Sequence, residues 1–215
     1  MITDGTTPLG ILAFLGLAGG TLLAALMSVI ALGRRRMDQV RLAAGVTGFV
    51  WASYGLVLTA TSALSTERVL GLGEEKHICE IDCHVAYTVT GVRSAFTIEG
   101  RTAAGTFYIV SLYVRFDAAT ISAHRGMAPL TPGPRIVEVR DQAGRVYTPL
   151  PQSGASSLER SLVPGQGYAT TLLFDLPTDI HNPRLFIGAQ SGWPDRLVIG
   201  SENSLWHGKT LFRLS

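Results

Sequence analysis

Two long apolar runs near the N-terminus decide the fold. Residues 8–32 read PLGILAFLGLAGGTLLAALMSVIAL, and residues 42–66 read LAAGVTGFVWASYGLVLTATSALST. Neither run contains a charged residue. A helix that crosses the bilayer core needs roughly 20 apolar residues, so each run is long enough. We therefore expect two transmembrane helices, at residues 8–32 and 42–64.

The connection between the two runs, residues 33–41, indicates their orientation. Its four arginines are Arg34, Arg35, Arg36 and Arg41. Short loops rich in Lys and Arg remain in the cytoplasm, whereas the N-terminal segment 1–7 has no basic side chain. We expect the N-terminus outside, the arginine loop inside, and everything after the second helix outside, which means the periplasm in a Gram-negative cell. A cleaved signal peptide is the competing interpretation, but it needs basic residues before the apolar run.

Small residues recur at a spacing of four in both runs. Gly16 and Gly20 have this spacing in the first run, and Ala44 and Gly48 have it in the second. Small residues four apart let two helices approach closely. They either pack the two helices against each other or dock one face onto another membrane subunit. Neither run holds an Asp, Glu, Lys, Arg or His residue, so transport through this chain alone is not favoured.

The rest of the chain has the pattern of an all-β domain. Overall, 47% of the residues are hydrophobic and 16% are charged, against about 25% charged in soluble domains, because the two runs dilute the charge. A polar hinge at residues 65–76 leads to short runs of alternating polarity separated by Gly, Pro and Asp. The expected strands are residues 84–92, 106–116, 135–140, 145–148, 167–175, 184–187, 196–199 and 209–214. Seven or eight such strands predict a β-sandwich over residues 77–215.

The order of these strands resembles a known family. The strand FYIVSLYVRF precedes the hairpin IVEVRDQAGRVYTP, with Gly144 at its turn. A Leu-Val-Pro-Gly turn at 162–165 and a strand ending in Phe-Asp-Leu-Pro at 174–177 follow. This order resembles the immunoglobulin-like extracellular domains grouped as DUF4352, which often follow a membrane anchor. The resemblance implies an immunoglobulin-like sandwich with a binding or scaffolding role, because the fold itself gives no activity.

Both cysteines lie in one segment, HICEIDCH, residues 77–84. Outside the cytoplasm, Cys79 and Cys83 are expected to form a disulfide. Residues four apart in a strand are about 13 Å apart, so the bridge requires a turn between the two cysteines, since bridged Cα atoms lie about 4.4–6.8 Å apart. Two free cysteines and a redox-active pair are further alternatives.

The same segment offers ligands for a metal. The candidate donors are Cys79, Cys83, His84, His77 and His207. Thiolate and imidazole groups suit copper or zinc. Two cysteines with three residues between them resemble the dinuclear copper motif of cytochrome oxidase subunit II. Tyr87 and Thr90 stand where that family has its next histidine and methionine, so the resemblance implies at most a mononuclear site.

Covalent haem is a weaker alternative at the same segment. Cys79-x-x-x-Cys83-His84 is one residue longer than the c-type attachment motif. Domains of c-type cytochromes are mostly helical, whereas this domain has a β pattern. We therefore expect no cofactor, with copper as the alternative.

The remaining sequence favours binding over catalysis. No phosphate-binding loop, nucleophile elbow or His-Glu-x-x-His motif is present. A net charge of +2 is too small to indicate a nucleic-acid partner. Trp193 and Trp206 are candidates for a partner surface if they are exposed. We expect a non-catalytic accessory subunit of a larger membrane complex, respiratory or photosynthetic, with the bilayer and other subunits as partners. A copper or electron-transfer protein and a ligand-sensing module are the alternatives.

Overall fold

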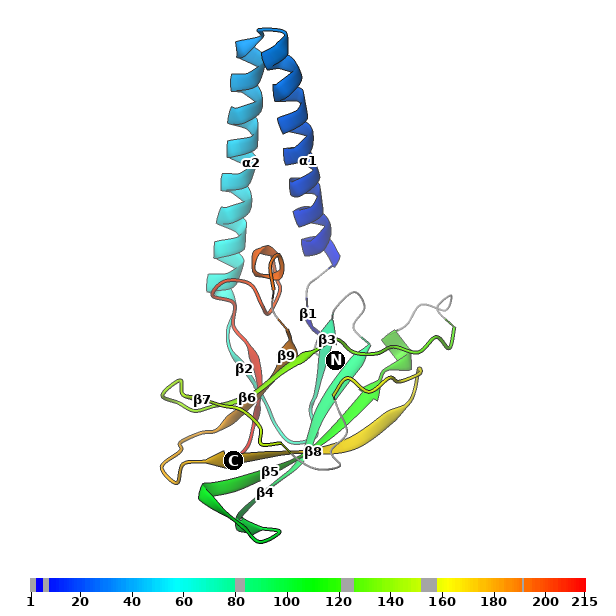
Figure 1. Ribbon diagram of the computed structural model, residues 1–215, viewed down its shortest axis with the longest axis vertical. Coiled ribbons are helices and arrows are strands. Elements are labelled where there is room, and N and C mark those ends of the chain that lie inside the picture. The colour runs from blue at the N-terminus through cyan, green and yellow to red at the C-terminus, as the bar shows by residue number, and fades with distance from the viewer. Residues whose placement is uncertain (1–2, 6–7, 80–83, 121–125, 152–157, 191) are drawn as a thin grey trace. The chain divides into compact units, whose positions relative to one another are not determined.

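The computed structural model describes residues 3–5, 8–79, 84–120, 126–151, 158–190 and 192–215 (Figure 1). The chain divides into two compact units. The helical unit comprises residues 6–66 and 191–208, and the β unit comprises residues 1–5, 67–190 and 209–215. Each unit therefore combines segments from distant parts of the sequence.

Two long helices form a hairpin in the helical unit (Figure 1). They are α1 (Pro8–Gly33) and α2 (Met37–Leu64), and both are long and apolar enough to cross a membrane. The expected loop 33–41 is too long, because α2 begins at Met37. Asp38 in the first turn of α2 suits the positive end of the helix dipole, which helps to explain the early start. The turn between the helices is therefore only residues 34–36.

The β unit contains two five-stranded sheets. In spatial order, the first sheet consists of β1 (Thr3–Gly5), β3 (Glu75–Cys79), β4 (Val85–Ile98), β5 (Arg101–Phe116) and β8 (Gly167–Leu176). The second consists of β2 (Arg68–Leu70), β10 (Thr210–Arg213), β9 (Arg184–Ala189), β6 (Arg135–Arg140) and β7 (Val146–Tyr147). Side chains of both sheets share one core, so the expected two-layer β architecture is present.

Strand β5 contributes every second side chain to the core, as its alternating sequence predicts. Val110, Leu112, Val114 and Phe116 are fully buried, while the residues between them lie on the other face of the strand. The second sheet contributes side chains such as Ile187 to the same cluster. Burying each side chain of this size stabilises the fold by about 1.5–3 kcal/mol.

A buried lysine links the two sheets inside this core. Lys76 of β3 is fully buried, and its ammonium group donates to the carbonyl oxygen of Thr210 in β10 at 2.9 Å. The same ammonium lies 4.7 Å from the ring centroid of Phe186 in β9. A buried cation requires such partners, because an isolated charge in an apolar interior is very costly.

Several expected strands change in the structure. β4 and β5 are longer than expected and form one hairpin, in which Glu99 and Gly100 both have positive φ, 49° and 77°. Two such residues are typical of the type I′ turn that joins tightly paired strands. β1 and β2 lie in the N-terminal segment and in the hinge, where the sequence predicts no strand.

The expected strand at residues 196–199 is wrong. This segment belongs to the helical unit and contains the short 3₁₀ helix η2 (Asp195–Leu197). The Leu197 N–H donates to Pro194 O at 2.8 Å, and the Val198 N–H donates to Asp195 O at 3.1 Å. These local hydrogen bonds replace the strand pairing that the apolar residues had indicated.

Gly105 in β5 provides a test of the sheet packing. A Cβ atom at this position would lie 2.1 Å from the carbonyl oxygen of Leu176 in β8. Gly105→Ala should therefore force the strands apart and lower the melting temperature of the β unit by roughly 5 °C or more. The melting temperature is followed by near-UV circular dichroism on the full chain in detergent.

Gly91→Ala is the matched control, because a Cβ at Gly91 meets only the Cβ of Ser111 at 4.0 Å. It should melt within a degree or two of the unsubstituted chain. Equal melting temperatures for the two variants would contradict the packing described for β5 and β8.

Candidate functional site

The two helices contact each other through a narrow line of side chains. Leu17 and Thr21 of α1 and Ala43 and Thr47 of α2 are buried or half-buried. A hydrogen bond joins the two helices: the indole N–H of Trp51 donates to the Thr21 hydroxyl at 3.0 Å. Thr21 also donates to its own helix, at Leu17 O, over 2.7 Å.

Most large apolar side chains of α1 and α2 are exposed. The most exposed include Leu9, Leu22, Leu42, Phe49 and Leu56. A core helix of a soluble protein buries such residues, and a contiguous apolar surface of this size marks a lipid or protein contact. The helical unit is therefore the candidate site.

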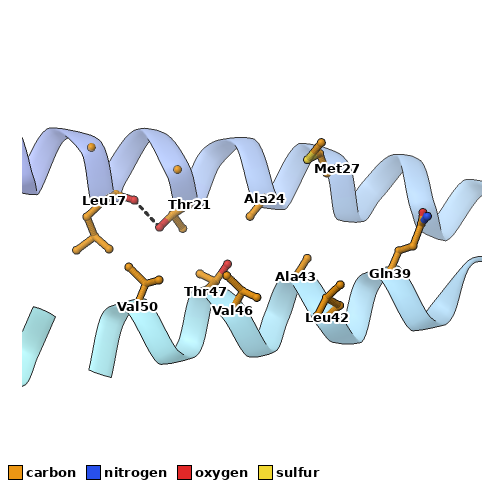
Figure 2. Close-up of a pocket in the computed structure, with 12 residues that line it drawn as sticks. Leu17, Thr21, Ala24, Met27, Gln39, Leu42, Ala43, Val46, Thr47 and Val50 are labelled. Atoms are coloured by element: carbon orange, nitrogen blue, oxygen red, sulfur yellow. Dashed lines mark hydrogen bonds between the residues drawn. The ribbon is translucent and has the colours of Figure 1, made fainter. Parts of the chain in front are cut away.

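A groove runs between α1 and α2 (Figure 2). Its volume is about 510 Å³. It is lined by Gly16, Leu17, Gly20, Thr21, Ala24, Met27, Gln39, Leu42, Ala43, Val46, Thr47 and Val50. In Figure 2, Met27 and Gln39 lie toward one end of the groove, and Leu17 and Val50 lie toward the other. The lining is mainly aliphatic, with amide and hydroxyl groups from Gln39, Thr21 and Thr47.

The four small residues with a spacing of four fall into two pairs with different surroundings. Gly16 and Gly20 line the groove, whereas Ala44 and Gly48 are exposed and do not line it. A Cβ at Gly16, Gly20 or Gly48 would have no atom within 4 Å. These glycines are therefore not the points where α1 and α2 touch, and their role in docking stays a prediction.

A second part of the helical unit is the segment 192–208. The hydroxyl of Tyr54 in α2 donates to Leu197 O at 2.6 Å, and the Gly208 N–H donates to the Ser65 hydroxyl at 2.7 Å. At the start of α1, a Cβ on Gly10 would lie 2.3 Å from Ile199 O. Only glycine permits this close approach of the segment to α1.

This segment carries both candidate tryptophans. Trp193 and Trp206 are 74% and 76% exposed, as a partner or membrane surface requires.

Tyr54 lies 17 residues after Met37, or about 26 Å along α2. This distance approaches the thickness of the bilayer core, about 30 Å. Aromatic side chains are enriched at that depth, at the membrane–water interface.

A buried polar cluster lies on the first sheet of the β unit. The His77 Nε2 atom lies 3.1 Å from Asp117 Oδ2 and 4.0 Å from Glu75 Oε2. The Arg115 guanidinium donates to Glu75 Oε2 at 2.8 Å and lies 3.1 Å from Asp117 Oδ1. His77 is only 1% exposed, and its Nδ1 atom has no hydrogen-bond partner among the described residues.

The cluster has ligand types that could bind a metal, but Arg115 already forms ion pairs with both of its carboxylates. Ligand atoms of Glu75, His77 and Asp117 lie within 4.8 Å of one another. The Arg115 guanidinium bonds both carboxylates, so it occupies the position of a cation between them. The geometry therefore favours a structural ion-pair network on the first sheet.

These contacts determine the ionisation of Asp117. Burial alone raises the pKa of its carboxyl, but hydrogen bonds from the Ala119 N–H, His77 and Arg115 and the charge of Arg115 outweigh burial, so the net pKa is lowered. The hydrogen bond to Glu75 is the main cause that raises the pKa of Arg115. Both groups are therefore ionised at neutral pH.

The predicted cysteine and histidine site is only partly within the described structure. Cys83 lies in residues 80–83, outside the described residues, and Cys79 ends β3. The expected Cys79–Cys83 disulfide therefore gains no support. His84 is buried and its ring stacks on Phe116, with centroids 5.3 Å apart. Among the described residues, His77 joins Glu75 and Asp117, and neither His84 nor His207 belongs to that group.

His207 has a local contact, since its Nδ1 atom lies 2.7 Å from Gly208 O in the helical unit. The sequence interpretation missed Glu75, Arg115 and Asp117. A signal was present, because Glu75 and His77, and likewise Arg115 and Asp117, are two residues apart and so share one face of a strand. The sequence alone does not show that β3 pairs with β4 and that β4 pairs with β5, which is what brings these residues together.

No protein-family model and no curated protein matches the chain, so the DUF4352 resemblance has no family-level match. Among solved structures, it is similar to MPT63, a secreted protein from Mycobacterium tuberculosis, at 14% sequence identity and a TM-score of 0.41, over 58% of this chain and 98% of that one. It is also similar to the yjhA protein from Bacillus subtilis, at 16% identity and a TM-score of 0.41, over 67% of this chain and 98% of that one.

The polar cluster predicts a defined pH dependence of stability. The pKa of Asp117 is lower in the folded chain than the value of about 3.9 in an unfolded chain. The stabilisation from Asp117 is therefore complete above that pH and is lost as the pH falls through the folded-state pKa. Asp117→Asn should melt several degrees below the unsubstituted chain at pH 7, and this gap should narrow below about pH 4.

Thermal unfolding of the full chain between pH 3 and pH 7 measures both effects. Asp179→Asn is the control, because Asp179 is exposed and its substitution should leave the pH profile unchanged. A gap between Asp117→Asn and the unsubstituted chain that stays constant down to pH 3 would contradict the assignment.

Proposed function

We propose that this chain is a membrane-anchored, non-catalytic subunit of a larger membrane complex. Its helices would cross the bilayer and dock onto neighbouring subunits, and its immunoglobulin-like β domain would lie outside the cytoplasm. The observation that carries the proposal is the apolar surface of α1 and α2, which the two helices leave exposed.

The pairing of β1 supports this topology. β1 precedes α1, and it pairs with β3, which follows α2. The two ends of the helical hairpin therefore belong on one side of a membrane. The arginine turn belongs on the opposite side, and by the positive-inside rule that side is the cytoplasm.

The exposed face of α2 supports docking. Ala44 and Gly48 are exposed, and the space beside Gly48 is empty. Transmembrane helices associate by close backbone approach at such small residues, since lipid gives no hydrophobic drive for association. The ion pairs of Arg115 with Glu75 and Asp117 support a structural role for the β domain.

Gly48→Leu tests the docking role. The full chain is extracted from its native membranes in mild detergent, and its particle mass is measured by light scattering after size exclusion. We expect a particle heavier than one 23.0 kDa chain with its detergent, containing other proteins. A leucine at position 48 should release them, because it blocks the close approach of a partner helix.

Gly19→Leu is the matched control, because Gly19 is exposed and also has no atom near its Cβ position. It should co-purify with the same proteins as the unsubstituted chain. A stable lone monomer from native membranes, with no co-purifying protein, would contradict the proposed function.

A further inference from the structure

We propose that the groove between α1 and α2 binds an acyl chain of an anionic phospholipid, with the lipid phosphate held at the arginine turn. This ligand is separate from the protein partner discussed above, because Ala44 and Gly48 do not line the groove. Three features of the groove carry the proposal: its length, its lining and the charge at its end.

The length of the groove matches one leaflet of the bilayer. Its lining extends from Gln39 to Val50 on α2 and from Gly16 to Met27 on α1. Each interval is 11 residues, or about 16 Å of helix. The bilayer core is about 30 Å thick, so one leaflet contributes about 15 Å. A partner helix would need a contact surface along the whole span, which makes a single acyl chain the better fit.

The lining is suited to a flexible aliphatic ligand. The volume of about 510 Å³ lies within the range of about 300–1,000 Å³ for small-molecule sites. Gly16 and Gly20 provide the width, because each has empty space where a Cβ would be. The Thr21 hydroxyl is already engaged by Trp51 and Leu17, so this side of the lining presents mainly carbon to the ligand.

The end of the groove near the turn is positively charged. Gln39 lies three residues after Arg36, so the arginine turn adjoins this end within about one helical turn. Arg34, Arg35, Arg36 and Arg41 form no ion pair with any described residue. The nearest acidic residue in the sequence is Asp38, which leaves a net excess of positive charge. Basic pockets between transmembrane helices on the cytoplasmic side recognise anionic headgroups.

Trp51 makes this proposal measurable, because it follows Val50 at the far end of the groove. In a Trp193→Phe/Trp206→Phe background, Trp51 is the sole tryptophan of the chain. The full chain is reconstituted into phosphatidylcholine vesicles that contain either brominated phosphatidylglycerol or brominated phosphatidylcholine. Bromine on the acyl chain quenches tryptophan fluorescence on contact.

Brominated phosphatidylglycerol should half-quench Trp51 at a mole fraction about tenfold lower than brominated phosphatidylcholine, since each basic residue near the phosphate favours the anionic lipid. Gly20→Leu fills the groove and should remove this preference, whereas Gly19→Leu, which leaves the groove lining intact, should retain it. The Arg34→Gln/Arg35→Gln/Arg36→Gln variant should also lose the preference while its groove remains open.

Equal quenching by the two lipids would overturn the proposal. A Gly20→Leu variant that keeps the preference would overturn it as well. The arginine variant tests the role of the positive charge without changing the groove. The proposal therefore remains testable even if leucine at position 20 disturbs the packing of the two helices. Far-UV circular dichroism confirms the helical content of each variant.

Discussion

The constraint on which the molecule depends is the need to cover the apolar surface of α1 and α2. The two helices bury little of it against each other, and side chains such as Leu22 and Phe49 remain exposed. Each of them would lose about 1.5–3 kcal/mol in water relative to an apolar environment. The hydrocarbon or partner helices of the proposed membrane setting would remove this cost. The backbone is compatible with this environment, because helices satisfy their own hydrogen bonds.

This constraint also explains how the β unit is connected. α1 follows β1 at the edge of one sheet, and α2 precedes β2 at the edge of the other. The helical hairpin is thus an insertion near the start of a sandwich, and both of its ends return to strands of that sandwich. The helices themselves are joined by one short turn, which carries three of the four arginines. Residues 8–32 and 42–66 hold no charged side chain, and arginines gather at the turn between them, a distribution that agrees with the cost of placing arginine in hydrocarbon.

The sequence predicts the elements whose signal is local. Uninterrupted apolar runs give the two helices, and alternation gives the core strand β5 together with the hairpin of β6 and β7. Elements that depend on a distant partner are missed. β1 is a three-residue strand because β3 pairs with it, and residues 195–197 form a 3₁₀ turn within the helical unit although their neighbours are apolar. The groove could not be predicted either, since its shape depends on which faces of α1 and α2 meet.

The crossing of the membrane is tested most directly by the accessibility of single cysteines. In a Cys79→Ser/Cys83→Ser background, one variant carries Gly33→Cys beside the arginine turn, and another carries Ser215→Cys at the end of the β unit. Sealed vesicles of one orientation are treated with a membrane-impermeant maleimide before and after permeabilisation. We expect only one of the two cysteines to react in sealed vesicles, and the other to react only after permeabilisation. Equal labelling of both in sealed vesicles would contradict a hairpin that crosses the bilayer.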